Sequence, residues 1–158
     1  MGLEIERKFL VAGEGWRQPA ERQQRFSQGY LSRDPARTVR VRLSGSSAGE
    51  QAFLTVKGKT VGTSRAEFEY EIPPADARQL LQLCEGPLID KIRHLCEFQG
   101  RTWEVDEFFG DNAGLIVAEI ELAAEDEVFA RPDWLGQEVS GEARYYNANL
   151  AVTPYRAW

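Results

Sequence analysis

Strict alternation of apolar and charged residues opens the chain. In residues 1–11, MGLEIERKFLV, the side chains of Glu4, Glu6 and Lys8 fall on one face of an extended strand and apolar side chains fall on the other. The same period of two returns at residues 27–32, 38–43, 51–57, 67–72, 89–98, 101–108 and 115–122. The pattern predicts about eight β-strands. Short turns join most of them, so we expect antiparallel pairing, and closure into a barrel would remove the exposed sheet edges.

The segments between the strands have weaker patterns. A helix is expected over residues 75–84, after Pro73 and Pro74, and a final helix over 144–152. The remaining expectations are one or two helical turns within 19–25, a flexible hairpin loop over the Gly- and Ser-rich residues 44–49, and a short solvated helix starting at the acidic residues 125–127.

Composition narrows the class of protein. A chain of 158 residues is most simply one domain, here residues 1–158. No apolar run is long enough for a bilayer and no signal-peptide pattern follows Met1, so we expect a cytoplasmic protein with no membrane partner. Cys84, in the predicted helix, and Cys96, in a strand, are expected to be reduced thiols. The oligomeric state is not readable from the chain, which leaves a homodimer open.

The net charge of −6 comes from 19 basic and 25 acidic residues and argues against a nucleic-acid-binding surface. It does not exclude a cavity that concentrates cations. The charged strand faces are in fact sorted by sign. The cations are Lys8, Arg40, Arg42, Lys57, Lys91 and Arg93, and the anions are Glu4, Glu6, Glu67, Glu69, Glu104, Asp106, Glu119 and Glu121.

An open sheet with a solvated charged face would explain each strand separately. It would not explain why residues two positions apart carry the same charge, as Arg40 and Arg42 do. A dry interior is excluded, because burying one unpaired carboxylate costs several kcal/mol. Neighbouring like charges repel, so ligands of opposite charge are expected between them. Oxygen ligands without a His or Cys cluster favour Mg²⁺ or Mn²⁺, and Arg and Lys suit phosphate oxygens. The residues therefore indicate a hydrated tunnel for a metal-complexed oligophosphate.

Two other readings of the chemistry fail. Gly58-Lys59-Thr60 is not a phosphate-binding P-loop, because Phe53 stands where that motif needs a further glycine and a strand follows. His94 is the only histidine and falls on an apolar face, so we expect a structural role for it. Ser–His or Cys–His catalysis has no support.

Taken together, these residues resemble the CYTH domains, or triphosphate tunnel metalloenzymes. The opening Glu4-x-Glu6-x-Lys8 is similar to the signature of that family, and the other charged doublets follow in the same order over nearly the whole chain. The resemblance implies an α+β fold: an eight-stranded, closed antiparallel barrel with a charged interior, surrounding helices and a C-terminal plug helix. It also implies a triphosphate-containing substrate.

The resemblance further assigns roles by position. It implies metal ligands at Glu4, Glu6, Glu119 and Glu121, with nearby or second-metal candidates at Glu67, Glu69 and Asp106. The implied phosphate clamp is Lys8, Arg40, Arg42, Lys57, Lys91 and Arg93, with Arg144 at the start of the plug. The implied catalytic residues are Glu6, Lys8, Tyr30 and Glu121. Tyr30 resembles a tyrosine that pairs with the signature lysine, although a plain strand aromatic is the alternative. Ala143 stands where a basic residue is expected, which weakens the phosphate-binding role of the plug.

The leading expectation is hydrolysis of tripolyphosphate to pyrophosphate and phosphate. One divalent ion would hold the triphosphate, and a second, more weakly held, would orient and acidify the attacking water. Adenylate cyclase activity on ATP and hydrolysis of thiamine triphosphate stay open within the same family. A binding module without catalysis, for polyphosphate or nucleotide, is the alternative from another class.

Overall fold

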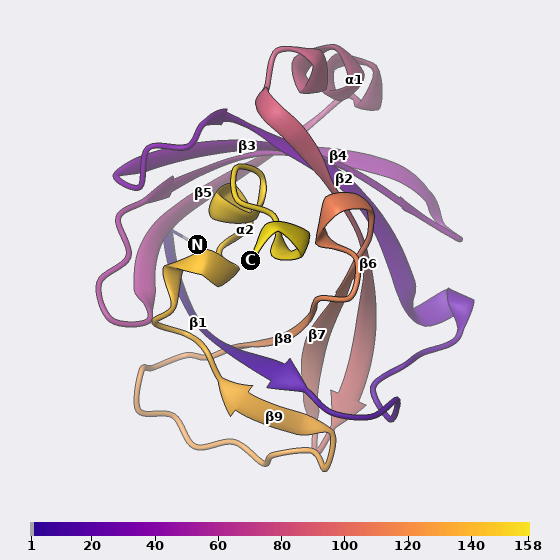
Figure 1. Ribbon diagram of the computed structural model, residues 1–158, viewed down its shortest axis with the longest axis vertical. Coiled ribbons are helices and arrows are strands. Elements are labelled where there is room, and N and C mark those ends of the chain that lie inside the picture. The colour runs from indigo at the N-terminus through magenta and orange to yellow at the C-terminus, as the bar shows by residue number, and fades with distance from the viewer. Residues whose placement is uncertain (1) are drawn as a thin grey trace.

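The computed structural model describes residues 2–158 and is dominated by strands (Figure 1). The strands are β1 (Gly2–Val11), β2 (Gln23–Ser32), β3 (Arg37–Ser46), β4 (Gly49–Gly58), β5 (Ser64–Ile72), β6 (Glu85–Phe98), β7 (Arg101–Phe108), β8 (Ile116–Glu121) and β9 (Leu135–Glu138). The helices are α1 (Pro74–Gln82) and α2 (Asn147–Leu150), with single 3₁₀ turns at Ala20–Arg22, Gly110–Asn112, Ala143–Tyr145 and Tyr155–Ala157. The predicted first strand corresponds to β1, with Met1 outside the described residues.

Eight of these strands close into an antiparallel barrel, as predicted. The order is β5-β4-β3-β2-β6-β7-β8-β1, and β1 closes the ring because its first residues pair with β5 while residues 6–10 pair with β8. The additional strand β9 pairs with the end of β1, outside the ring. Strand alternation then sends the charged side chains inward and the apolar side chains outward, the reverse of the usual small barrel.

Three apolar clusters pack against the barrel wall. Around Trp103, the outer faces of β1, β7 and β8 pack against residues of the connecting loops, including Trp16 and Phe129. A second cluster lies on the inner face at one end of the barrel, where Phe108 and Val117, on the same sheet face as Lys91 and Asp106, pack with Leu150 of the C-terminal residues. On the outside, α1 covers a third cluster through Ala77 and Leu81. The outer covering is less helical than expected, because α1 covers only one of the outer clusters and loop residues with β9 cover the cluster around Trp103. Among the described residues, neither helix has the length and apolar character needed to span a bilayer.

Several local predictions are wrong. The acidic residues 125–127 start no helix; they form a turn in which Glu125 accepts hydrogen bonds from Thr63 and Glu127 accepts one from the amide of Ala123. Residues 44–49 are not a flexible loop, since β3 and β4 continue to a tight turn at 47–48. Cys84 follows α1 rather than lying in it; both cysteines are free thiols.

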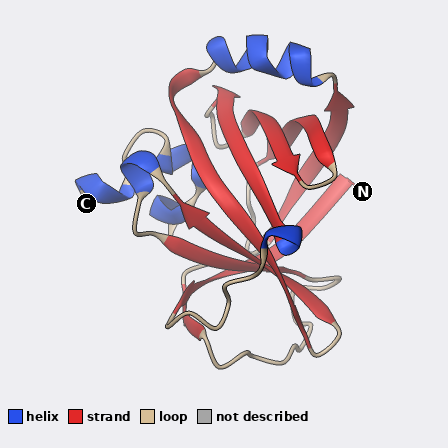
Figure 2. Ribbon diagram, turned by 90° about the vertical axis from the view of Figure 1, so that its right-hand side faces the viewer, coloured by secondary structure: helices blue, strands red, loops and turns tan. Residues whose placement is uncertain are grey.

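The final helix is shorter than the predicted range 144–152. Only Asn147–Leu150 is α-helical, and Pro154, which cannot continue a helix, lies shortly after it. We call residues 140–158 the C-terminal cap. In the view along the barrel the cap projects onto the centre of the ring, and in the perpendicular view it lies at one side of the strands (Figures 1 and 2). The cap therefore covers one end of the barrel, where the plug is expected.

Gly29 is a position where the wall tolerates no side chain. A Cβ there would lie 2.7 Å from Leu88 Cδ2 and 2.9 Å from Cys84 Sγ. We expect Gly29→Ala to lower the free energy of unfolding by about 1–3 kcal/mol, the usual cost of overpacking. Urea denaturation measures it. Gly45→Ala, on β3 with open space around it, is the matched control and should change stability by less than about 0.5 kcal/mol. Equal losses for both variants would contradict the packing argument.

Candidate functional site

The barrel encloses a cavity of about 630 Å³ whose wall carries charges of both signs. Most of the side chains singled out from the sequence line it: Glu4, Glu6, Lys8, Tyr30, Arg40, Arg42, Lys57, Glu67, Glu69, Lys91, Arg93, Glu104, Glu119 and Glu121. They come from all eight barrel strands: seven of these strands carry charged residues on the inner face, and β2 contributes Tyr30. Asp106 and Arg144 are not among the lining residues.

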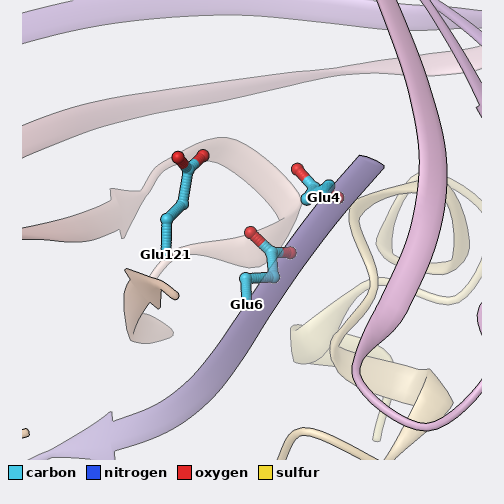
Figure 3. A group of neighbouring side chains, drawn as sticks. All are labelled: Glu4, Glu6 and Glu121. Atoms are coloured by element: carbon cyan, nitrogen blue, oxygen red, sulfur yellow. The ribbon is translucent and has the colours of Figure 1, made fainter. Parts of the chain in front are cut away.

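Three carboxylates meet on one side of the cavity. Glu4 and Glu6 project from β1, and Glu121 stands opposite Glu6 on β8 (Figure 3). One carboxylate oxygen of each lies within 4.8 Å of the others. We call these residues the acidic triad. Three convergent oxygen ligands beside open space fit a hard divalent cation that keeps part of its water shell.

The charges of the acidic triad are unfavourable without a cation. Burial, together with the neighbouring Glu119, raises the pKa of Glu6 to about 8. Burial and the carboxylates of Glu104, Glu4 and Glu6 raise the pKa of Glu121 to about 7. Burial also raises the pKa of Glu4, against the effect of Lys57. A divalent cation would relieve this repulsion, so the residues present fit a metal ion.

Two lysines flank the acidic triad. Lys8 Nζ donates to Glu119 at 2.8 Å and to Glu6 at 3.4 Å, and these carboxylates raise the pKa of Lys8 although burial opposes them. Lys57 Nζ lies 2.9 Å from a Glu4 oxygen and 3.1 Å from Glu67. Lys8 therefore stays charged, and both lysines lie beside the place where a cation and a phosphate would meet.

A group of cations lies elsewhere on the cavity wall, around the ring of Phe26. The Arg42 guanidinium lies 4.1 Å from the ring centroid, that of Arg93 lies 5.0 Å away, and Lys91 Nζ lies 5.9 Å away. Burial, with the help of Arg40 and Arg93, lowers the pKa of Arg42 to about 9. Burial and the guanidiniums of Arg93 and Arg42 also lower the pKa of Lys91 to about 7, against the effect of Asp106. A polyanion would relieve this crowding, as a metal ion would at the acidic triad.

Two predicted site residues have other roles in the structure. Asp106 is fully buried on the inner face of β7 without lining the cavity, and it bridges Lys91 Nζ at 2.6 Å and Arg93 Nε at 2.8 Å. Its carboxylate is held by these two cations as their internal counter-ion and lies outside the acidic triad, so a role as a second-metal ligand stays a prediction. Arg144 is exposed on the C-terminal cap, stacked on Tyr145 and Trp158, and does not reach the cavity as expected of a phosphate-binding residue.

The other predicted metal ligands are paired with cations. Glu119 binds Lys8, Glu67 binds Lys57, and Glu69 lies 3.5 Å from Arg40. They stand around the acidic triad and not within it. Tyr30 lines the cavity, with no hydrogen bond from its hydroxyl to Lys8 among the described residues, so its catalytic role stays a prediction.

His94 lies outside the cavity. Its Nδ1 accepts a hydrogen bond from the Gln18 amide at 3.2 Å, and its Nε2 lies 3.1 Å from Glu107. The ring also packs edge-on against Trp16. These contacts are those of a structural histidine.

Some residues that line the cavity were not predicted from the sequence. Arg33, Lys59 and Arg65 add cations to the wall, and Asn147 reaches it from the C-terminal cap. Arg65 could have been found, because it continues the alternation of Glu67 and Glu69 by one step toward the start of β5. Asn147 carried no signal, since its position depends on how the cap folds back.

Fold and site together define an antiparallel tunnel with an acidic triad and a cationic group on its inner wall. The sequence model of the CYTH domain matches residues 2–155, and the chain belongs to this family. An inorganic triphosphatase of Acetivibrio thermocellus is 48% identical over 157 residues, covering 99% of this chain and 97% of the relative. An inorganic triphosphatase of Nitrosomonas europaea is 35% identical, covering 95% and 97%.

Solved structures agree with this assignment. The crystal structure of an inorganic triphosphatase superposes with a TM-score of 0.65 at 32% identity, covering 94% of this chain and 97% of that chain. The chain thus matches these proteins over nearly their full length.

Proposed function

We propose that this protein hydrolyses tripolyphosphate to pyrophosphate and phosphate with a divalent metal ion. The observation that carries the proposal is the pair of unbalanced charge groups in one cavity: the acidic triad and the cations around Phe26. A metal–polyphosphate complex has the charges that both groups lack. Kinship to proteins named inorganic triphosphatases supports the choice of substrate.

The acidic triad would hold the metal ion, with Glu4 and Glu6 from β1 and Glu121 from β8. Bound there, the ion would supply charge neutralisation for the triphosphate and would acidify water. Mg²⁺ and Mn²⁺ are the ions that this all-carboxylate set favours. Around the triad, Glu67, Glu69 and Glu119 hold the neighbouring cations in place.

The cations would bind the phosphate oxygens. Arg40, Arg42, Lys57, Lys91 and Arg93 line the same cavity and would orient the chain of phosphates. Lys8, held by Glu119 and Glu6, would stabilise the charge that develops on the phosphate next to the acidic triad. Tyr30 would contact the substrate from β2.

The setting of the enzyme is also a proposal. We take residues 1–158 as one CYTH domain acting on a small triphosphate. Cys84 and Cys96 are unpaired thiols, which fits the reducing cytoplasm.

Incubation of the pure protein with tripolyphosphate, ATP and thiamine triphosphate, each with Mg²⁺ or Mn²⁺, tests the proposal. We expect equal amounts of pyrophosphate and phosphate from tripolyphosphate by ³¹P NMR, faster than turnover of the other two. Addition of EDTA should abolish turnover, because the acidic triad needs the ion, and excess Mg²⁺ should restore it.

Other products would overturn the proposal. Cyclic AMP and pyrophosphate from ATP as the main products would identify a cyclase. Faster hydrolysis of thiamine triphosphate would identify that compound as the substrate. Tight binding of tripolyphosphate without turnover would identify a binding module.

A further inference from the structure

Two neutral amides lie between two cations of the cavity. Gln28 Oε1 accepts a hydrogen bond from Arg42 Nε at 2.8 Å. Gln28 Nε2 donates to Asn147 Oδ1 at 3.1 Å, and Asn147 Oδ1 also accepts a hydrogen bond from Lys91 Nζ at 3.0 Å. The chain of contacts thus runs from β3 through β2 and the C-terminal cap to β6. We call Gln28 and Asn147 the amide pair.

The chemistry of the two cations fixes how both amides are turned. Arg and Lys side chains are donors only, so the oxygen of Gln28 must face Arg42 and the oxygen of Asn147 must face Lys91. The amino group of Gln28 is then left for Asn147. Gln28 is fully buried, so it is held in this one arrangement.

The amide pair differs from the other partners of the cavity cations. Arg93 is held by carboxylates on all three nitrogens, and Lys8, Lys57 and Lys91 are each paired with a carboxylate as well. Arg42, in contrast, forms no ion pair within residues 2–158, and its two terminal nitrogens form no hydrogen bond there. A neutral acceptor can fix the direction of a cation without cancelling its charge, whereas a carboxylate does both.

Donors also remain free on both cations. Lys91 uses one N–H on Asp106 and one on Asn147, which leaves the third. Arg42 uses only its Nε, which leaves the edge of four terminal N–H groups that suits a phosphate. Both side chains line the cavity.

We propose that the amide pair, Gln28 and Asn147, positions Arg42 and Lys91 to bind the end of the polyphosphate that lies away from the acidic triad, and that it leaves the charge of Arg42, which has no carboxylate partner among the described residues, available to the ligand. Both amides are positioning residues that act through these two cations. The C-terminal cap thereby contributes to substrate binding through Asn147, without Arg144. This role rests on the proposed function, because it needs a phosphate ligand in the cavity.

Asn147→Asp tests the proposal, since it keeps the shape of the side chain and adds a negative charge. We expect KM for tripolyphosphate to rise about tenfold or more while kcat changes less than about threefold. The reason is that a hydrogen bond to a charged group changes binding affinity by about tenfold, and the new carboxylate would compete with phosphate for Lys91. Thermal unfolding should stay within a few degrees of the unaltered protein or shift upward. Gln82→Glu, the same change on the exposed face of α1, is the control and should leave KM unchanged.

A double-mutant cycle separates a linked pair from two independent residues. Gln28→Leu and Asn147→Leu should each raise KM about fivefold, and the double variant should raise it by no more than about tenfold, since linked residues are not additive. A product of about 25-fold would mean independent action and would overturn the pairing. An unchanged KM in Asn147→Asp, with the fold intact, would overturn the positioning role.

Calorimetric titration with tripolyphosphate in the absence of metal distinguishes this proposal from the proposed function. Weaker binding by Asn147→Asp, in a protein whose unaltered form binds but does not hydrolyse tripolyphosphate, would support the amide pair and refute the hydrolase. Hydrolysis by the unaltered protein together with equal binding and KM in Asn147→Asp would refute the amide pair alone.

Discussion

Replacing Glu6 with Gln is expected to lower kcat for tripolyphosphate hydrolysis by about a thousandfold, because metal-ion catalysis contributes several kcal/mol to the barrier. The substitution keeps the shape of the side chain and removes one of the three carboxylates of the acidic triad. It should also weaken Mg²⁺ binding, measured by calorimetry. The steady-state rate of phosphate release measures kcat.

The same variant should lose activity without losing stability. Glu6 is half-buried beside Glu119, and its pKa is raised to about 8, so its ionisation opposes folding when no metal is bound. Metal-free Glu6→Gln should therefore unfold at the same temperature as the unaltered protein or higher. Glu71→Gln, an exposed carboxylate of β5 that is not part of the cavity wall, is the matched control and should keep full activity. Full activity in Glu6→Gln would contradict the metal assignment.

Asp106→Ala is expected to have the largest effect on stability. Asp106 is fully buried and is the shared counter-ion of Lys91 and Arg93, at 2.6 Å and 2.8 Å. Removing one partner of such a pair leaves buried charge without compensation, which costs about 3–5 kcal/mol. Urea denaturation at neutral pH measures the loss. The exposed pair Arg78–Glu50 offers the control: Glu50→Gln should cost less than about 1 kcal/mol.

The pH dependence of stability is a second test of the role of Asp106 as a counter-ion. Although burial opposes it, Arg93 and Lys91 lower the pKa of Asp106 from 3.8 to about 2. A lowered pKa means that the contribution to stability is present above pH 3.8 and is lost as the pH falls through about 2. The unaltered protein should lose this part of its stability over that interval, and Asp106→Asn should not. Equal acid unfolding of both would contradict the role of counter-ion.

The barrel and the composition of its wall could be predicted because one rule governs them. Alternate side chains of a strand lie on opposite faces of the sheet. If the apolar side chains pack on the outer face, the charged side chains must therefore share the inner face. The same parity put Glu4, Glu6 and Glu121 on the inner face but did not separate them from the other carboxylates there; the family resemblance had implied Glu119 as a fourth ligand. The charges themselves excluded a dry interior, which left bulk water or a solvated cavity as their surroundings.

Other features depend on contacts that no local pattern records. Asp106 stands two positions after Glu104, as in the other pairs of inward-facing charged residues, so the sequence does not distinguish it. Its role as a counter-ion follows only from its contacts with Lys91 and Arg93. The acidic residues 125–127 have the local pattern of a helix start. In the structure, Glu125 instead accepts hydrogen bonds from Thr63, some sixty positions away. Asn147 enters the site because the C-terminal cap folds over the barrel end, which no strand pattern specifies.

The central claim is that the acidic triad and the cations around Phe26 hold the two parts of one metal–polyphosphate complex. An anomalous difference map from crystals grown with Mn²⁺ and tripolyphosphate, using Glu121→Gln if turnover is too fast, tests this most directly. The account predicts a manganese peak bound by the carboxylates of Glu4 and Glu6, with phosphate density extending to Lys91 and Arg42. Manganese bound elsewhere, or phosphate density that does not reach these two cations, would contradict it.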